Sequence, residues 1–209
     1  MRPARLALIG LAGLVLVLVA VAALLRATSG TGGADEAFRG SIPPSGVALP
    51  SFAARDHLGR PVRSEELRGK VVVLTLLDSQ CVESCPVIAT VLGRGLDRLT
   101  GEERGRVAAV AVSTDPAEDT RVAVARFLRE RRAVGRFAYL VAPEPEIRRL
   151  WRELQVLSSL ETGDDNLHSA PVRVYGAEGE WLSTLHAGAD LTEENLVHDV
   201  RLALAREEP

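Results

Sequence analysis

The sequence predicts an α/β domain built on one mixed β-sheet with helices on both faces, preceded by one N-terminal transmembrane helix. Residues 6–25 contain no charged side chain, which is typical of a membrane-spanning segment. The runs 71–77 and 107–112 are continuously apolar and β-branched, as in buried parallel strands, and a helical pattern separates them. A hairpin pattern at 172–185 comes last, so the sheet is expected to be mixed rather than purely parallel.

The N-terminus has the features of a membrane anchor. Arg2 and Arg5 precede the 20 uncharged residues at 6–25, and a helix of that length crosses the roughly 30 Å of hydrocarbon in a bilayer. A cleaved signal peptide has a shorter apolar run of about 7–15 residues, and Arg26 stands where small residues would precede a cleavage site. We therefore expect residues 1–26 to stay as a single-pass anchor, with the domain on the extracytoplasmic side of the cell membrane.

Composition restricts what the rest of the chain can do. Residues 27–45 are rich in Gly, Ser, Thr and Pro and are expected to form a flexible linker to a domain at 46–209. From residue 27 onward, 22 basic residues face 28 acidic ones, so no basic surface for nucleic acid is expected. Two cysteines exclude a four-thiolate zinc or iron-sulfur site, and the single methionine, the first residue, excludes thioether copper clusters.

Hydrophobic periodicity places the remaining elements of the domain. Short extended runs on either side of a turn predict a small hairpin at 52–62. Apolar residues at helical spacing predict a helix at 86–99, although Gly93 and Gly95 weaken its middle. By the same criteria, helices are expected at 120–132, 146–156 and 191–205, and strands at 137–141, 172–175 and 181–185.

The chemistry of the sequence concentrates at Cys81 and Cys85. Both lie in DSQCVESCP, between the strand at 71–77 and the helix expected to begin at Pro86. Proline is favoured at the first helical position, which places Cys85 at or near the N-cap. There the helix dipole and unpaired N–H groups should lower the thiol pKa, so we expect two reactive sulfur atoms or two good metal ligands. Two ordinary core cysteines or a structural disulfide are the plainer alternatives.

His168 is the candidate for a third functional residue. It lies in ETGDDNLHSAP, a polar segment before the last hairpin that is expected to be a loop, and loops at strand ends often carry function. A lone histidine in a loop is more commonly just solvated. His57, His186 and His198 have no second ligand nearby in the sequence and are interpreted as structural residues.

From about residue 47 to 205 the sequence resembles the Sco/SenC family, membrane-anchored copper proteins with a thioredoxin-like fold that serve cytochrome c oxidase assembly. The resemblance rests on the order of three motifs: CxxxCP at 81–86, Ser-x-Asp-Pro at 113–116, and a histidine 11 residues before Gly179. It implies that Cys81, Cys85 and His168 bind one copper ion and that Asp115 belongs to the loop beside them.

Copper fits such a ligand set. Two thiolates and one imidazole suit Cu(I), Cu(II) could be held with a fourth ligand, and zinc would accept the same groups. Binding requires the reduced dithiol, so a Cys81–Cys85 disulfide would release the metal. The resemblance implies a metallochaperone that supplies the dinuclear copper centre in subunit II of cytochrome c oxidase, or that keeps the thiols of this centre reduced.

A membrane-anchored thiol-disulfide oxidoreductase is the alternative. Pro171 resembles the proline that faces the redox cysteines in the TlpA/ResA group, although that group uses CxxC, and the added histidine favours a metal here. A peroxiredoxin is excluded because the threonine expected three residues before the reactive cysteine is Asp78 or Val82. The sequence departs from the Sco/SenC pattern at two places. Val82 stands where a proline is common, and residues 77–79 stand where aromatic residues are common. These departures affect the expected partner-docking surface more than the expected metal ligands.

Overall fold

The computed structural model describes residues 37–155 and 171–207. The expected anchor at 1–26 and His168 lie outside the described residues, as does most of the expected linker. Within the described residues, no helix is long and apolar enough to cross a membrane.

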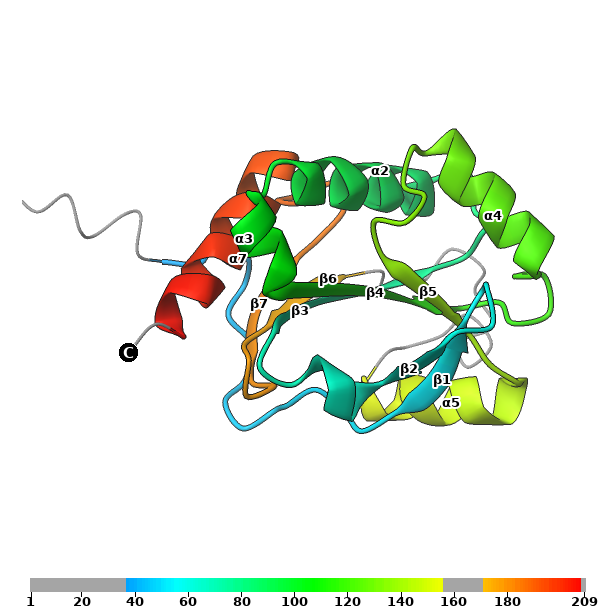
Figure 1. Cartoon of the computed structure of the whole chain (residues 1–209), viewed down its shortest axis with the longest axis horizontal. Helices are drawn as coiled ribbons and strands as arrows, with labels where there is room; N and C mark the ends of the chain where they lie inside the picture. The colour runs from blue at the N-terminus through cyan, green and yellow to red at the C-terminus, as the bar shows by residue number, and fades with distance from the viewer. Residues whose placement is uncertain (1–36, 156–170, 208–209) are drawn as a thin grey trace, which may run out of the picture. The chain divides into compact units, whose positions relative to one another are not determined.

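One seven-stranded sheet in the order β2-β1-β5-β4-β3-β6-β7 forms the centre of the domain (Figure 1). β3, β4 and β5 are parallel, and an antiparallel hairpin flanks them on each side, β1–β2 next to β5 and β6–β7 next to β3. The mixed sheet and both hairpins are as predicted. The strands are β1 (Ala53–Asp56), β2 (Pro61–Arg63), β3 (Val71–Leu77), β4 (Val107–Ser113), β5 (Ala138–Val141), β6 (Val172–Tyr175) and β7 (Trp181–Leu185).

Helices cover both faces of the sheet, as expected. α2 (Ser84–Asp97), α4 (Arg121–Glu130) and α7 (Glu193–Arg206) lie over one face, and α5 (Glu144–Glu153) lies over the other (Figure 1). Successive side chains of a strand point to opposite faces, so all seven residues of β3 are buried in one of two cores. Val71, Val73 and Leu77 pack with α2, α4 and α7, whereas Val72, Leu74 and Leu76 pack with α5.

The structure adds two helices to the predicted set and shifts the bounds of the others by up to three residues. The 3-10 helix η1 (Ser64–Leu67) and the short helix α3 (Gly101–Gly105) were not predicted. A capping box starts α3, because the Thr100 hydroxyl accepts the Glu103 N–H and the Glu103 carboxylate accepts the Thr100 N–H. α2 runs from Ser84 to Asp97, two residues earlier than predicted at each end. Its Gly95 allows close packing on α7, since a Cβ there would lie 2.8 Å from Leu196 Cδ2.

The part of the expected linker that the structure describes packs against the domain from Phe38 onward. The fully buried carboxylate of Asp199 on α7 accepts the backbone N–H groups of Arg39 and Gly40, at 2.8 and 3.0 Å, and the hydroxyl of Ser183. Ser41 continues this contact by pairing with Thr184 along the outer edge of β7. These contacts cover a sheet edge that would otherwise expose unpaired backbone groups.

Replacing Asp199 should detach this segment. Asp199→Ala removes the acceptor of two backbone N–H groups and one buried hydroxyl, so we expect the free energy of unfolding to fall by about 2–4 kcal/mol. Urea unfolding of the full chain in detergent measures the loss, and faster proteolysis near residue 38 would accompany it. Glu194→Ala, which removes only an exposed ion pair with Arg39, is the control and should cost under about 1 kcal/mol. Equal stability of the two variants would contradict the role of Asp199.

Candidate functional site

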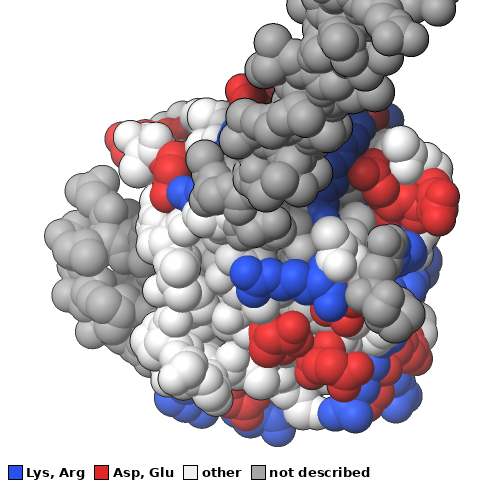
Figure 2. All heavy atoms as spheres, turned by 90° about the vertical axis from the view of Figure 1, so that its left-hand side faces the viewer, with Lys and Arg blue, Asp and Glu red and all other residues white. Residues whose placement is uncertain are grey.

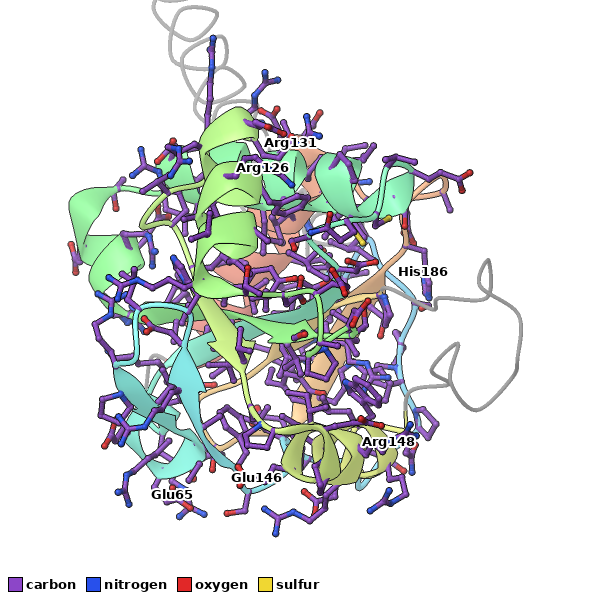
Figure 3. All side chains as sticks on the ribbon, turned by 90° about the vertical axis from the view of Figure 1, so that its right-hand side faces the viewer. Glu65, Arg126, Arg131, Glu146, Arg148 and His186 are labelled. Carbon is purple, nitrogen blue, oxygen red and sulfur yellow. The ribbon has the colours of Figure 1, made fainter. Side chains whose placement is uncertain are left out.

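The predicted site residues that the structure describes, Cys81, Cys85 and Asp115, lie at one edge of the sheet. β3 and β4 run in parallel with Leu77 opposite Ser113, so the loops that follow them begin side by side. Cys81 and Cys85 follow β3, and Asp115 follows β4. We call this end of the parallel strands the dithiol edge. In Figure 3 the sulfur atoms appear in yellow at the end of α2, on the side of the molecule that faces the viewer.

The backbone at residues 78–81, which leads into Cys81, folds over the sulfur of Cys85. The Asp78 carboxylate accepts the Gln80 N–H at 2.6 Å and the Asp78 carbonyl accepts the Cys81 N–H at 3.3 Å, which forms a tight turn. The Asp78 N–H points at Cys85 Sγ at 3.5 Å. α2 then begins at Ser84, with no side chain capping its N-terminus, and Cys85 is its second residue. Cys81 follows this turn and packs against the core cluster that contains Cys85.

The two thiols differ in exposure. Both are free, but Cys81 is half-buried whereas Cys85 is only 2% exposed. Burial raises the pKa of Cys85, with a smaller contribution in the same direction from Cys81, and the Asp78 N–H opposes the rise only in part. The predicted lowering of the Cys85 pKa is therefore wrong, because desolvation of the thiolate outweighs stabilisation by the helix N-terminus.

A buried carboxyl group that the sequence analysis did not identify holds this loop in place. Asp119 lies between β4 and α4 and is fully buried. One of its oxygens accepts the backbone N–H of Ser79 at 2.8 Å, and the other lies 2.6 Å from the Ser113 hydroxyl and 2.8 Å from the Tyr139 hydroxyl. Asp119 thus ties the ends of β3 and β4 to Tyr139 of β5 and fixes the start of the segment that carries Cys81.

Burial of Asp119 favours its protonated form, although the groups that donate hydrogen bonds to it favour the ionised form. The Tyr139 hydroxyl lies within hydrogen-bonding distance of both the Leu77 carbonyl, at 2.9 Å, and Asp119, but it has one proton to donate. A protonated Asp119 could donate to Tyr139 while Tyr139 donates to Leu77. Burial raises the pKa of Asp119, opposed by the groups that donate to it, and burial beside Asp119 raises the pKa of Tyr139 well above its usual range.

Asp115 and the three described histidines make separate interactions and do not form one cluster. Asp115 lies in the expected loop, where its carboxylate accepts the N–H groups of Ala117 and Glu118 and stabilises the turn. His198 and His186 each interact with a nearby aspartate, at 3.0 and 3.9 Å, and His57 donates its backbone N–H to Tyr139, in keeping with structural roles. In the described part of the chain, no three His, Cys, Asp or Glu side chains form a group able to hold a metal. The predicted ligand His168 lies outside that part.

Comparisons with known proteins agree with this architecture. The family model described as SCO1/SenC matches residues 44–205. A Stutzerimonas stutzeri protein, named as a candidate copper-binding protein, is 27% identical over 140 residues, covering 65% of this chain and 68% of that protein. Apo Sco1 from Thermus thermophilus matches with a TM-score of 0.66 at 24% identity, over 81% of this chain and 98% of that one. Yeast Sco1 with copper bound matches with a TM-score of 0.64 at 20% identity, over 78% and 91%. The predicted thioredoxin-like α/β fold is confirmed.

The unequal exposure of the thiols predicts unequal alkylation. Cys81 should react with iodoacetamide at pH 8 at least tenfold faster than Cys85, because Cys85 is buried and its pKa is raised. Mass spectrometry of the reduced full chain, with Cys81→Ser and Cys85→Ser as single-thiol references, measures both rates. Cys85 labelling should accelerate only at strongly alkaline pH or on unfolding, and equal rates at pH 8 would contradict the buried position.

The raised pKa of Asp119 predicts a pH dependence of stability. Asp119 should ionise at higher pH in the folded chain than in the unfolded chain, so stability should fall as pH rises from about 4 through the folded-state pKa. Asp119→Asn cannot ionise and should flatten this slope in urea unfolding, whereas Glu118→Gln, an exposed neighbour, should not. Asp119→Ala should cost about 2–3 kcal/mol and speed alkylation of Cys81, because the Ser79 N–H loses its acceptor. An unchanged slope in Asp119→Asn would contradict the assignment.

Proposed function

The chain belongs to the SCO1/SenC family, and from this premise we propose that it is a copper chaperone that holds its ion with Cys81, Cys85 and His168. The observation that carries the proposal is the pair of free thiols at the head of α2, where Cys81 packs against the core cluster that contains Cys85. Two sulfur atoms at one turn can ligate one ion, and thiolate ligands suit soft ions such as Cu(I). The copper-binding relative and the copper-bound yeast structure support the same metal.

The topology supports His168 as the third ligand. β6 runs antiparallel to β3, with Arg173 opposite Leu74, so the chain enters β6 from the dithiol edge. Val172, the first residue of β6, belongs to the same core cluster as Cys85. Three residues lie between His168 and Val172, and these four residue steps span at most about 14 Å. The connection to β6 is long enough to bring His168 to the dithiol edge, which supports the proposal.

Burial of the site sets the protonation chemistry of binding. Copper must displace the proton of the Cys85 thiol, and the raised pKa of Cys85 makes this displacement costly at neutral pH. Copper affinity should therefore rise with pH. The same burial shields the ion from water, and a half-buried Cys81 gives an acceptor protein access to one ligand at a time.

The cargo and its destination complete the proposal. We propose that residues 1–26 anchor the chain in the cell membrane, that the domain lies on the extracytoplasmic side, and that it delivers copper to the dinuclear centre of cytochrome c oxidase subunit II. Cu(I) is the cargo expected in a three-ligand site, and Cu(II) would need a fourth ligand. Asp115 is not proposed as this ligand, because its carboxylate is already engaged in the turn after β4.

The unequal thiols also favour a second candidate, a thiol-disulfide oxidoreductase. The half-buried Cys81 thiolate would attack a substrate disulfide and form a mixed disulfide, releasing one substrate thiolate. The buried Cys85 would then attack Cys81, releasing the second substrate thiolate and leaving the Cys81–Cys85 disulfide. Two electrons pass to the substrate, and a separate dithiol reductant must restore the pair. In this function His168 has no role.

Copper titration separates the two functions. The reduced full chain should bind one equivalent of Cu(I) in competition with a colorimetric chelator, and His168→Ala should lower the affinity at least tenfold, because it removes one of three ligands. The matched control is His186→Ala, which removes a half-exposed histidine just after β7. This variant should leave the copper affinity unchanged. Cys81→Ser and Cys85→Ser should each abolish tight binding. Unchanged affinity in His168→Ala, with rapid disulfide reduction, would favour the oxidoreductase.

A further inference from the structure

An unusually basic segment begins beside the dithiol edge. Residues 121–136, which comprise α4 and the turn after it, contain six arginines and one glutamate. Elsewhere the chain has 19 basic residues against 27 acidic ones. The positive charge is therefore local, on an otherwise acidic protein.

Four of these arginines are exposed and lack an acidic partner in the described part of the chain. They are Arg121, Arg126, Arg129 and Arg132, which we call the arginine ridge. The other two arginines of the segment are engaged, Arg131 over the Phe127 ring and Arg136 with Asp97.

Other helices of the domain balance their charges differently. The α5 arginines Arg148 and Arg149 pair with glutamates one turn away. On the opposite side of the molecule, basic and acidic side chains are interspersed (Figure 2). The ridge therefore differs in concentrating four unpaired arginines within residues 121–132.

The ridge leads directly to the cysteines. Asp119, two residues before α4, binds the Ser79 N–H, so the first turn of α4 lies beside the Cys81 loop. Val122 in that turn is 77% exposed and occupies the same helical stripe as Arg126 and Arg129. Val82, next to Cys81, is 87% exposed. An apolar rim at the dithiol edge thus continues into a basic surface, and Figure 3 shows Arg126 and Arg131 on the same side of the molecule as the sulfur atoms.

We propose that the arginine ridge and this apolar rim together form the docking surface for an acidic face of the protein that exchanges copper or electrons with Cys81. This inference rests on the proposed function and adds the surface on which the partner sits. Arginine is enriched at protein interfaces, and a desolvated apolar centre beside a charged border is the usual interface anatomy. The helix α4 carries the arginine ridge, and its first turn lies beside the Cys81 loop. A partner bound to the ridge is therefore placed next to the dithiol.

A protein partner accounts for the observations better than an anionic membrane surface. Phe38 packs beside the Arg206 guanidinium, 4.5 Å from its ring, at the end of α7 remote from the dithiol edge. The chain thus enters the domain at the opposite edge from the cysteines. A lipid surface against α4 would also cover the rim of the dithiol and block transfer to a soluble acceptor domain.

Charge reversal on the ridge tests the proposal. Arg126→Glu with Arg129→Glu is compared with Arg149→Glu and Arg152→Glu on α5, which changes net charge equally. The probe is the copper-free, reduced copper-centre domain of cytochrome c oxidase subunit II, mixed with the copper-loaded full chain in neutral detergent. We expect the ridge variant to slow second-order transfer at least tenfold at 20 mM salt and less than threefold at 0.5 M salt, because salt screens electrostatic steering. The α5 variant should stay within twofold of the unchanged chain.

The readouts separate this proposal from the proposed function. Copper affinity, measured by chelator competition, should be the same in all three chains, so a transfer defect cannot come from the ligands. If the unchanged chain holds no copper, the proposed function fails, and the ridge is tested instead by the rate at which the reduced chain reduces the oxidised form of the same domain.

Two results would overturn the docking surface. One is equal rates for the ridge and α5 variants at low salt. The other is a ridge effect that appears only with vesicles containing anionic lipid, which would assign the arginines to the membrane.

Discussion

The arrangement of the dithiol edge depends on one buried carboxyl group. Asp119 reaches three strands at once, through Ser79 after β3, Ser113 at the end of β4 and Tyr139 in β5. Parallel strands bring loops to one edge but do not fix their conformation. The hydrogen bonds of Asp119 do so for the loop that carries Cys81, and their burial makes each one costly to break.

The same burial that orders the site limits its reactivity. Cys85 packs among residues of β3, α2 and α7, and this apolar surrounding raises its pKa. A chain that worked only as a reductase would gain from a thiol that ionises easily, whereas a carrier gains from a thiolate that forms when a metal is present to replace the proton. The raised pKa of the buried Cys85 therefore bears on both candidate functions, because it slows attack by the thiol and makes metal binding depend on pH.

Local patterns in the sequence predicted most of the fold. The continuous apolar runs of β3 and β4 and the polar turns of both hairpins are local signals, and the structure confirms them. The capping box of α3 is also a local signal, because it consists of a Thr followed three residues later by a Glu. The helix that it starts was nevertheless not predicted. The role of Asp119 has no such local signal, because its partners Ser79 and Tyr139 lie 40 and 20 residues away in the sequence. The Cys85 pKa was predicted in the wrong direction because the sequence shows the helix start but not the depth of burial, and His168 stays a prediction.

α4 joins the two halves of the proposed function. Its inner face, Val124, Phe127 and Leu128, is buried in the core, which fixes the helix on the sheet. Asp119 joins the start of α4 to the Cys81 loop, so the exposed arginines and the dithiol belong to one rigid unit. A partner that binds the arginine ridge therefore meets Cys81 in a constant orientation, and the specificity of transfer can reside in charge on α4 while the chemistry of the ion resides in the sulfur atoms.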